Sequence, residues 1–401
     1  MSLNQTPAGE RVHIGFFGLR NAGKSSLVNA VAGQSLSVVS DVCGTTTDPV
    51  RKAMELLPLG PVLLIDTPGF DDEGALGTQR VQKTREVLNE TDVAVLVTEA
   101  GRAFAPAEEE LLRLFRERET PFLIARNKSD LLPKDENRAG DQPPQNETYV
   151  SALTGLHIAE LKAAIARLAP EDPIKLRLVA DLIAPGDFVV LVTPIDKSAP
   201  KGRLILPQQQ AIRDILEADA TAITVKEFEL ADTLRALGRK PALVITDSQV
   251  FAKAAADVPP DIPLTSFSIL FARYKGYLSA AAAGVRALET LPGDSHILIA
   301  EGCTHHRQCD DIGTVKIPRW IRSETGKRFH SSSCSGWEFP ADLTGVDLVI
   351  HCGGCMLNER AVRARLRAAQ TQGVPFTNYG VVIAWAQGIL ERCLLNGRLG
   401  V

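Results

Sequence analysis

The chain has few aromatic residues and almost no excess charge. Phe, Trp and Tyr make up 5% of its 401 residues, and the formal net charge is −4 at pH 7. A protein that binds long nucleic acids neutralises their phosphates with a basic surface, and many such proteins stack exposed bases on aromatic side chains. We therefore expect no DNA partner and no bulk RNA partner.

Long hydrophobic runs are also missing. A membrane-spanning helix needs about 20 consecutive apolar residues, and the longest candidate, residues 266–285, is interrupted by Arg273 and Lys275. The first eleven residues lack the apolar core of a secretory signal. The sequence therefore predicts a cytoplasmic protein with no membrane partner.

Cysteine is scarce over the first 300 residues, where only Cys43 occurs. Five of the seven cysteines fall between residues 303 and 355. In a reducing compartment, a late cluster of this kind indicates metal or redox chemistry rather than disulfide bonds.

Proline-containing stretches at residues 169–173 and 258–263 divide the chain into three segments. In each segment short β-branched runs alternate with amphipathic stretches, which is typical of α/β domains with mostly parallel sheets. We expect one α/β domain over residues 8–172 and two smaller ones over 178–262 and 266–401. The expected strands are 12–17, 62–65, 93–97, 122–125, 188–192, 222–225, 243–246, 297–300, 348–350 and 375–379. The expected helices include 155–168, 208–217, 229–237 and the basic helix 359–369, whose arginines we assign to a solvated face.

Residues 18–25 read GLRNAGKS and fit the phosphate-binding loop G-x-x-x-x-G-K-S. The motif lies between an apolar strand and a helix-forming run, which is the context that it requires. Its backbone amides would wrap the phosphates of a nucleotide at a helix N-terminus. We expect Lys24 to reach the β- and γ-phosphates and Ser25 to bind Mg²⁺.

Three further motifs follow in order, each at a predicted strand end. Asp66 begins the sequence DTPG, in which this carboxylate can hold the magnesium shell and the Gly69 amide can sense the γ-phosphate. Asp130 ends the sequence NKSD, and its carboxylate can accept both N1–H and the exocyclic amine of guanine. Ser151 and Ala152 follow a short β run and suit a backbone contact to the guanine oxygen. Together the motifs predict a site for GTP and GDP. The predicted GTP-binding residues are Asn21, Ala22, Gly23, Lys24, Ser25, Ser26, Asp66, Asn127, Lys128, Asp130, Ser151 and Ala152, and the predicted catalytic residues are Lys24, Thr46 and Gly69.

The order and spacing of these motifs resemble the bacterial TrmE–Era-type GTPases over roughly residues 10–170. The resemblance implies that Asn21 holds K⁺ against the phosphates; the alternative is an amide that only stabilises the turn. Phe70 stands where Ras-like enzymes carry a water-orienting glutamine, so we expect slow hydrolysis. Relatives often read GTTRD where this chain has Thr47 in place of the arginine, and we choose Thr46 as the second Mg²⁺ ligand.

Two cysteine motifs end predicted strands of the third segment. One contains Cys303 and His305, and the other, HCGGC, contains His351, Cys352 and Cys355. Ligands collect at the carboxyl ends of parallel strands, so the two motifs can meet. Three thiolates suit a [4Fe–4S] cluster with one iron on a weaker ligand, or a structural zinc that needs a fourth protein ligand. The spacing leaves both open. His305 and His351 are the candidates to occupy or shield the fourth position, whereas Cys309, Cys334 and His330 are expected to be ordinary loop or packing residues.

A TrmE–Era-like GTPase and these cysteine motifs in one chain are similar to the [FeFe]-hydrogenase maturation GTPases, the HydF family. The resemblance covers essentially the whole chain, including LPQQQ at residues 206–210. It implies a dimerisation domain at 178–262 and a cluster domain at 266–401, with a [4Fe–4S] cluster on Cys303, Cys352 and Cys355. It also implies a scaffold and carrier, as a homodimer or a larger oligomer. Such a protein receives a di-iron precursor built with two radical-SAM maturases and delivers it to the apo-[FeFe]-hydrogenase.

Two other functions fit parts of the sequence. A ribosome- or tRNA-acting GTPase with a zinc-stabilised C-terminal domain would share the first 170 residues, but the acidic balance and the weak fourth zinc ligand disfavour it. A redox switch built on C-x-x-C leaves the nucleotide domain unexplained. We therefore predict a GTPase with GTP or GDP, Mg²⁺, K⁺ and a [4Fe–4S] cluster as its cofactors.

Overall fold

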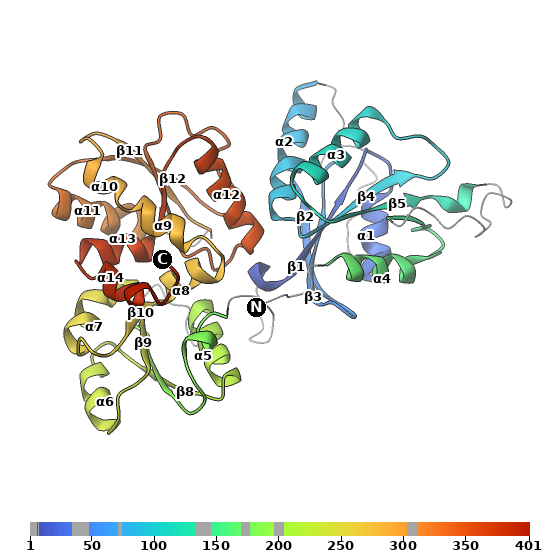
Figure 1. Ribbon diagram of the computed structural model, residues 1–401. Coiled ribbons are helices and arrows are strands. Elements are labelled where there is room, and N and C mark those ends of the chain that lie inside the picture. Colours follow the sequence, from blue (N-terminus) through green and yellow to red (C-terminus); the bar gives the residue numbers. More distant parts are fainter. Residues whose placement is uncertain are drawn as a thin grey trace. The chain divides into compact units, whose positions relative to one another are not determined.

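A computed structural model describes residues 6, 8–33, 48–70, 74–132, 146–169, 177–195, 204–302 and 311–401, and over residues 74–80 it describes the backbone alone. The chain forms two compact units, Met1–Pro173 and Ile174–Val401 (Figure 1). Both units are α/β, so the predicted fold class is confirmed. No helix among the described residues is both long enough and apolar enough to cross a membrane.

The first unit is built on a six-stranded sheet in the order β2-β3-β1-β4-β5-β6. All neighbouring strands are parallel except β2 and β3, which form an antiparallel pair. The strands are β1 (Val12–Phe17), β2 (Val50–Leu56), β3 (Gly60–Asp66), β4 (Val93–Glu99), β5 (Phe122–Asn127) and β6 (Glu147–Tyr149), and the helices are α1 (Lys24–Ala32), α2 (Gly74–Glu90), α3 (Pro106–Glu117) and α4 (Ile158–Leu168).

Helices cover both faces of this sheet because its central strands are apolar on both sides. Alternate residues of β1, β3, β4 and β5 pack against α1 and α4 on one face and against α2 and α3 on the other. Val95 and Leu96, neighbours on β4, are both fully buried and belong to opposite cores. This three-layer arrangement holds the carboxyl ends of β1, β3, β5 and β6 along one edge, where the nucleotide motifs lie.

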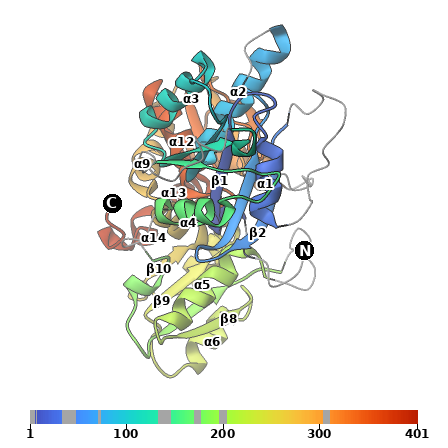
Figure 2. The ribbon, with the colours of Figure 1, turned by 90° about the vertical axis from the view of Figure 1, so that its right-hand side faces the viewer.

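The second unit contains two parallel four-stranded sheets. The first of them, which we call the middle sheet, has the order β10-β9-β7-β8. Helices α5 and α8 pack on one of its faces, and α6 and α7 pack on the other. Figure 1 labels all four helices, and Figure 2 shows α5, α6, β8 and β9 from the side. Its elements are β7 (Phe188–Val192), α5 (Leu206–Glu217), β8 (Thr221–Val225), α6 (Leu230–Ala236), β9 (Leu243–Thr246), α7 (Phe251–Asp257), β10 (Leu264–Ser266) and α8 (Phe267–Tyr274).

The other sheet of this unit, which we call the cysteine sheet, has the order β12-β11-β13-β14. One hydrophobic core runs from the middle sheet into the cysteine sheet, and it includes both Ile245 of β9 and Ile299 of β11. The elements are α9 (Leu278–Gly284), α10 (Ala287–Thr290), β11 (His296–Ala300), α11 (Ile317–Thr325), β12 (His330–Cys334), β13 (Leu348–His351), α12 (Glu359–Thr371), β14 (Phe376–Asn378), α13 (Tyr379–Ala386) and α14 (Leu390–Cys393).

Each strand expected from the sequence is present, with ends shifted by no more than two residues. Strand β6 is the short β run expected before Ser151, whereas strands β2, β10 and β12 were not expected. Strand β12 reads HSSSC and is mostly exposed, so it offers no apolar pattern. Strand β10 extends the middle sheet to Ser266, beyond the expected boundary at residue 262.

Candidate functional site

The phosphate-binding loop joins β1 to α1 and closes around the Lys24 ammonium. Lys24 Nζ donates to the carbonyl oxygens of Gly18 at 3.0 Å and Leu19 at 2.7 Å. Gly23 caps the helix at φ +86°, and a Cβ at this position would lie 2.2 Å from Asn127 Nδ2. Only glycine avoids both the backbone strain and this clash. The loop therefore presents backbone amides and a buried cation at the N-terminus of α1, an arrangement suited to phosphate.

Ser25 and Asp66, the residues predicted to face magnesium, lie in direct contact. Ser25 Oγ donates to Asp66 Oδ2 at 2.5 Å. Burial raises the pKa of Asp66, while this hydrogen bond and the Lys24 charge act in the opposite direction. A hydroxyl beside a carboxylate at the end of β3 can hold Mg²⁺ directly or through water.

The switch residues are described only in part. Thr46 lies outside the described residues. Gly69 lies against the phosphate-binding loop, where a Cβ would approach the Arg20 backbone to 3.0 Å. Phe70 is buried in the core between the sheet and α2, and its N–H donates to the Gly18 carbonyl. Its side chain is therefore not available to orient a water molecule.

The guanine motifs at the ends of β5 and β6 are joined by hydrogen bonds. Asn127 Nδ2 donates to the Ala22 carbonyl at 3.0 Å, and Asn127 Oδ1 accepts the Ala152 N–H at 3.1 Å. Ser151 Oγ donates to Asp130 Oδ1 at 2.6 Å. Asn127 thus connects the phosphate-binding loop to the segment after β6, and Ser151 holds the Asp130 carboxylate that is predicted to bind guanine.

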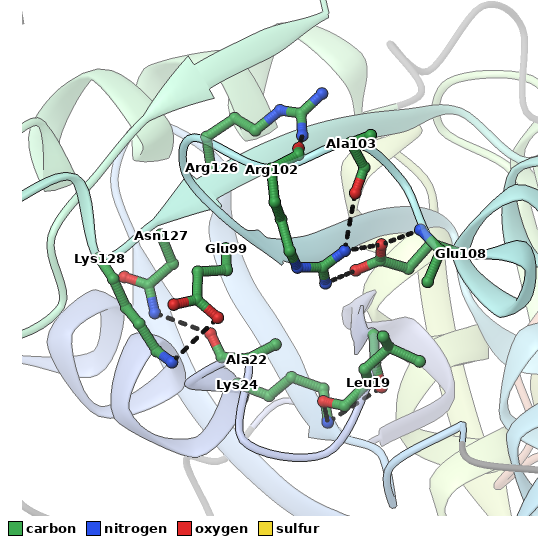
Figure 3. Close-up of polar contacts among 12 residues, drawn as sticks. Leu19, Ala22, Lys24, Glu99, Arg102, Ala103, Glu108, Arg126, Asn127 and Lys128 are labelled. Carbon is green, nitrogen blue, oxygen red and sulfur yellow. Dashed lines mark hydrogen bonds and ion pairs between the residues drawn. The ribbon is translucent and has the colours of Figure 1, made fainter. Parts of the chain in front are cut away.

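Sequence reasoning missed two ion pairs beside this site (Figure 3). Lys128 Nζ lies 3.4 Å from Glu99 Oε2, at the end of β4. Arg102 forms a bidentate ion pair with the buried Glu108. Its Nη1 donates to Oε2 at 2.7 Å and its Nη2 donates to Oε1 at 2.6 Å. Burial would raise the pKa of Glu108, but its bonds to Arg102 and to the Ala105 N–H hold that pKa below its usual value. No motif marks these residues, although an Arg six positions before a Glu at a helix start is visible in the sequence.

The cysteine motif HCGGC begins at the last residue of β13. Cys352 Sγ accepts the backbone N–H groups of Gly302 at 3.0 Å and Gly354 at 3.3 Å. Gly302 follows β11, so the end of that strand reaches Cys352 across the sheet. Burial raises the pKa of Cys352, and it raises the pKa of Cys355 to about 11. Two N–H donors aimed at one sulfur stabilise the thiolate form that a metal requires.

His351 is fully enclosed and neutral. Its Nδ1 lies 2.6 Å from the Cys352 carbonyl oxygen, and its Nε2 lies 3.1 Å from Arg365 Nη1. Arginine can only donate, so Nε2 accepts and Nδ1 carries the proton. Burial, followed by the Arg365 charge, lowers the pKa of His351 to about 3. Both ring nitrogens are occupied, so this arrangement favours shielding over metal ligation.

The expectation that every arginine of helix 359–369 is solvated is wrong for Arg365. Arg365 is 5% exposed and also donates to the Gly336 carbonyl at 2.5 Å. Its contacts with His351 and Gly336 are tertiary, so the polar pattern of the helix alone does not predict them.

The described cysteine site is incomplete in the part that carries Cys303 and His305, because both lie outside the described residues. Among the residues described, no group of three or more His, Cys, Asp or Glu side chains is placed to hold a metal ion. Cys334 ends β12 beside Ala300 and interacts electrostatically with Cys352. The N–H groups and cations around the described cysteines nevertheless suit thiolates that hold a cluster. Cys352 has two N–H donors, and the cations Lys275 and Arg365 are buried beside the cysteines.

Comparison with protein families divides the chain into three parts. Residues 13–128 match the family described as "50S ribosome-binding GTPase". Residues 178–276 match "Hydrogen maturase F dimerization domain", and residues 279–396 match "Hydrogen maturase F tetramerization domain". The last two matches together span more than half of the chain.

Curated relatives match mainly the first unit. GTPase Era of Carboxydothermus hydrogenoformans is 32% identical over 40% of this chain and 56% of its own length. GTPase Der of Wolinella succinogenes is 33% identical over 40% of this chain and 36% of its own length. The chain therefore spans about half or less of these relatives. A solved structure of Aquifex aeolicus Era bound to GDP and aluminium fluoride is 21% identical, with a TM-score of 0.35 over 56% of this chain and 98% of that one.

Proposed function

This chain belongs to the hydrogen maturase F family, and from that premise we propose that it is a GTP-hydrolysing scaffold and carrier. It binds a [4Fe–4S] cluster and delivers a di-iron precursor to the apo-[FeFe]-hydrogenase, and it receives that precursor through two radical-SAM maturases. One observation carries the proposal: two backbone N–H groups donate to the Cys352 sulfur. The same chain also contains a complete phosphate-binding loop.

The first unit supplies the GTPase. Lys24 and the amides of the loop before α1 hold the phosphates, Ser25 and Asp66 hold Mg²⁺ with Thr46, and Asp130 selects guanine. We assign K⁺ to Asn21, which lies in the loop at φ +61°. A monovalent cation there would neutralise charge that develops on the phosphates during hydrolysis. Loss of the γ-phosphate changes switch order, and such a change can regulate the exchange of partners.

The second unit supplies the cluster site. Cys352 and Cys355, with Cys303, would hold three irons, and the fourth iron would keep an exchangeable ligand. His351 shields the site and does not ligate, because both its ring nitrogens are bonded within the protein. A carrier needs an open iron, whereas a structural zinc needs four firm protein ligands. The engaged His351 therefore favours the cluster over the zinc alternative.

Anaerobic reconstitution of the full chain with iron and sulfide tests this proposal. We expect about four irons per chain, a visible absorption band and an EPR signal after reduction. Cys352→Ser should lose the cluster, because a hydroxyl is a poor iron ligand. Cys334→Ser is the matched control on the neighbouring strand and should retain it. One zinc per chain and no iron would instead support a ribosome- or tRNA-acting GTPase.

A further inference from the structure

Lys275 is a buried cation at the edge of the cysteine site. It follows α8 directly and is 3% exposed. Its Nζ donates to the carbonyl oxygen of Gly354 and, at 2.6 Å, to that of Leu357. Both acceptors belong to the loop of residues 352–357, which carries Cys352 and Cys355. The lysine therefore holds the cysteine loop through two hydrogen bonds to its backbone.

The backbone around Lys275 is shaped to hold it in this place. Gly276 adopts φ +71°, and a Cβ there would lie 2.3 Å from the Arg363 guanidinium. Arg363 Nε in turn donates to the Lys275 carbonyl at 3.4 Å. The Lys275 ammonium also lies 5.6 Å from the centroid of the Phe271 ring. A turn at a glycine of positive φ, contacted by Arg363 of α12, thus follows the buried lysine directly.

Lys275 and the cysteines come from different family domains. Lys275 lies within residues 178–276, which match the dimerization model, and the cysteine loop lies within residues 279–396. Other residues at the start of α8 also reach the cysteine sheet, since the Ser268 carbonyl accepts Asn378 Nδ2 at 3.0 Å. The site is therefore built jointly by the two domains of one compact unit.

Burial of an ammonium group is costly, and an anion nearby offsets that cost. The Lys275 charge acts on Cys355, and the buried Arg365 charge acts on Cys352. A cluster on three thiolates is negatively charged, and one-electron reduction adds a further negative charge. A fixed cation at this position stabilises the reduced form more than the oxidised form.

We propose, on the basis of the function proposed above, that Lys275 is a positioning residue of the cluster site, contributed by the dimerisation domain. Its hydrogen bonds fix the loop that carries Cys352 and Cys355, and its charge raises the reduction potential of the cluster.

Substitution of Lys275 in the full chain separates these two effects. Lys275→Gln keeps an N–H donor and removes the charge, and Lys275→Met removes both. Lys327→Met is the matched control, because Lys327 Nζ also donates to two backbone carbonyls, those of Glu289 and Leu291, in the same unit. Each protein is reconstituted anaerobically, its iron is counted, and its midpoint potential is measured by EPR-monitored titration.

We expect Lys275→Gln to bind iron like the wild type but to show at least a tenfold lower ratio of reduced to oxidised cluster at a fixed solution potential. For one electron this ratio is a shift of about 59 mV to more negative values. Lys275→Met should show the same shift and lower iron content, and Lys327→Met should match the wild type. A wild-type potential in Lys275→Gln overturns the charge role, and full iron content in Lys275→Met overturns the role in holding the loop. Failure of the wild type itself to bind a cluster refutes the proposed function, and this inference with it.

Discussion

Asp130 is oriented by one neighbour, and this hydrogen bond gives a prediction at the residue scale. Ser151 Oγ donates to Asp130 Oδ1 at 2.6 Å. Ser151→Ala removes that bond and leaves the carboxylate free to rotate. We expect GDP to bind about three- to tenfold more weakly, which corresponds to the loss of one hydrogen bond of about 1 kcal/mol. Calorimetric titration with Mg·GDP measures this change, and an unaltered affinity would show that Ser151 does not position the carboxylate.

Asn21 allows the potassium hypothesis to be tested without disturbing the loop. Its backbone lies at φ +61°, a conformation that glycine adopts without strain. Asn21→Gly therefore removes the amide and preserves the turn. We expect GTP turnover by the wild type to be faster in K⁺ than in Na⁺ buffer, and the variant to be slow in both. Steady-state phosphate release measures this; K⁺ stimulation that survives in Asn21→Gly would leave Asn21 as a turn residue only.

Single residues also show where sequence reasoning stops. The G-x-x-x-x-G-K-S and NKSD motifs are local, so they identify Lys24 and Asp130 without a structure. Lys275 and Arg365 are not identifiable in this way, because each serves a loop far along the chain. Arg365 lies in a helix with four arginines, and its contacts with the Gly336 carbonyl and the His351 ring are visible only in the structure.

At the scale of elements, Glu90 joins three parts of the GTPase unit. It ends α2, its Oε1 accepts Arg51 Nη2 of β2 at 2.6 Å, and its Oε2 lies 3.6 Å from His13 Nδ1 of β1. Strand β2 and helix α2 each follow a switch segment. Burial alone would lower the pKa of His13, but Glu90 and Asp92 outweigh it and raise that pKa above 6.5.

Removal of this carboxylate should therefore loosen both elements. In Glu90→Gln we expect the local opening free energy of β1 and β2 amides to fall by about 1–3 kcal/mol, since Arg51 and protonated His13 lose the negative charge that they face. Hydrogen exchange of the full chain measures it. Glu117→Gln, which breaks an exposed pair with Arg113, is the control and should change little.

The same contact makes the stability of this unit depend on pH. A histidine whose pKa is raised on folding stabilises the native state below its unfolded pKa, and this contribution is lost as pH rises through the native value. We expect exchange protection of β1 to decline as pH rises above about 6.5, after correction for intrinsic exchange rates. Glu90→Gln should show a smaller decline, and an equal decline in both proteins would assign the effect to other groups.

Elements with a strong apolar period were predictable, and edge elements were not. The buried run of β4 is apolar at five successive positions, and this pattern predicts a central strand. Strand β12 has no such run and is stabilised by its backbone pairing with β11 in register. Strand β10 has only three residues, and it is a strand because it pairs with β9. Its place in the middle sheet therefore depends on tertiary contacts that a local sequence pattern does not predict.

At the scale of the whole molecule, the middle sheet offers a surface for self-association. Among the described residues, strand β8 pairs with β7 on one side and has no strand on the other, and Phe228, which follows it, is 76% exposed. An unpaired edge beside an exposed aromatic residue is typical of an interface between copies. We expect Phe228→Asp to shift the protein toward the monomer in light-scattering chromatography. Leu153→Asp, at a residue 86% exposed in the GTPase unit, is the control and should keep the wild-type mass. Equal masses for both variants would exclude this edge.

The central claim is that the chain carries and delivers a di-iron precursor, and the most direct measurement is activation of apo-[FeFe]-hydrogenase. The protein is loaded in the presence of the two radical-SAM maturases, re-isolated and mixed with apo-hydrogenase, and hydrogen evolution is recorded. We predict activity with the wild type and with Cys334→Ser, and none with Cys352→Ser or Cys355→Ser. Hydrogen evolution that is equally strong with Cys352→Ser, or absent with a fully loaded wild type, would contradict the account.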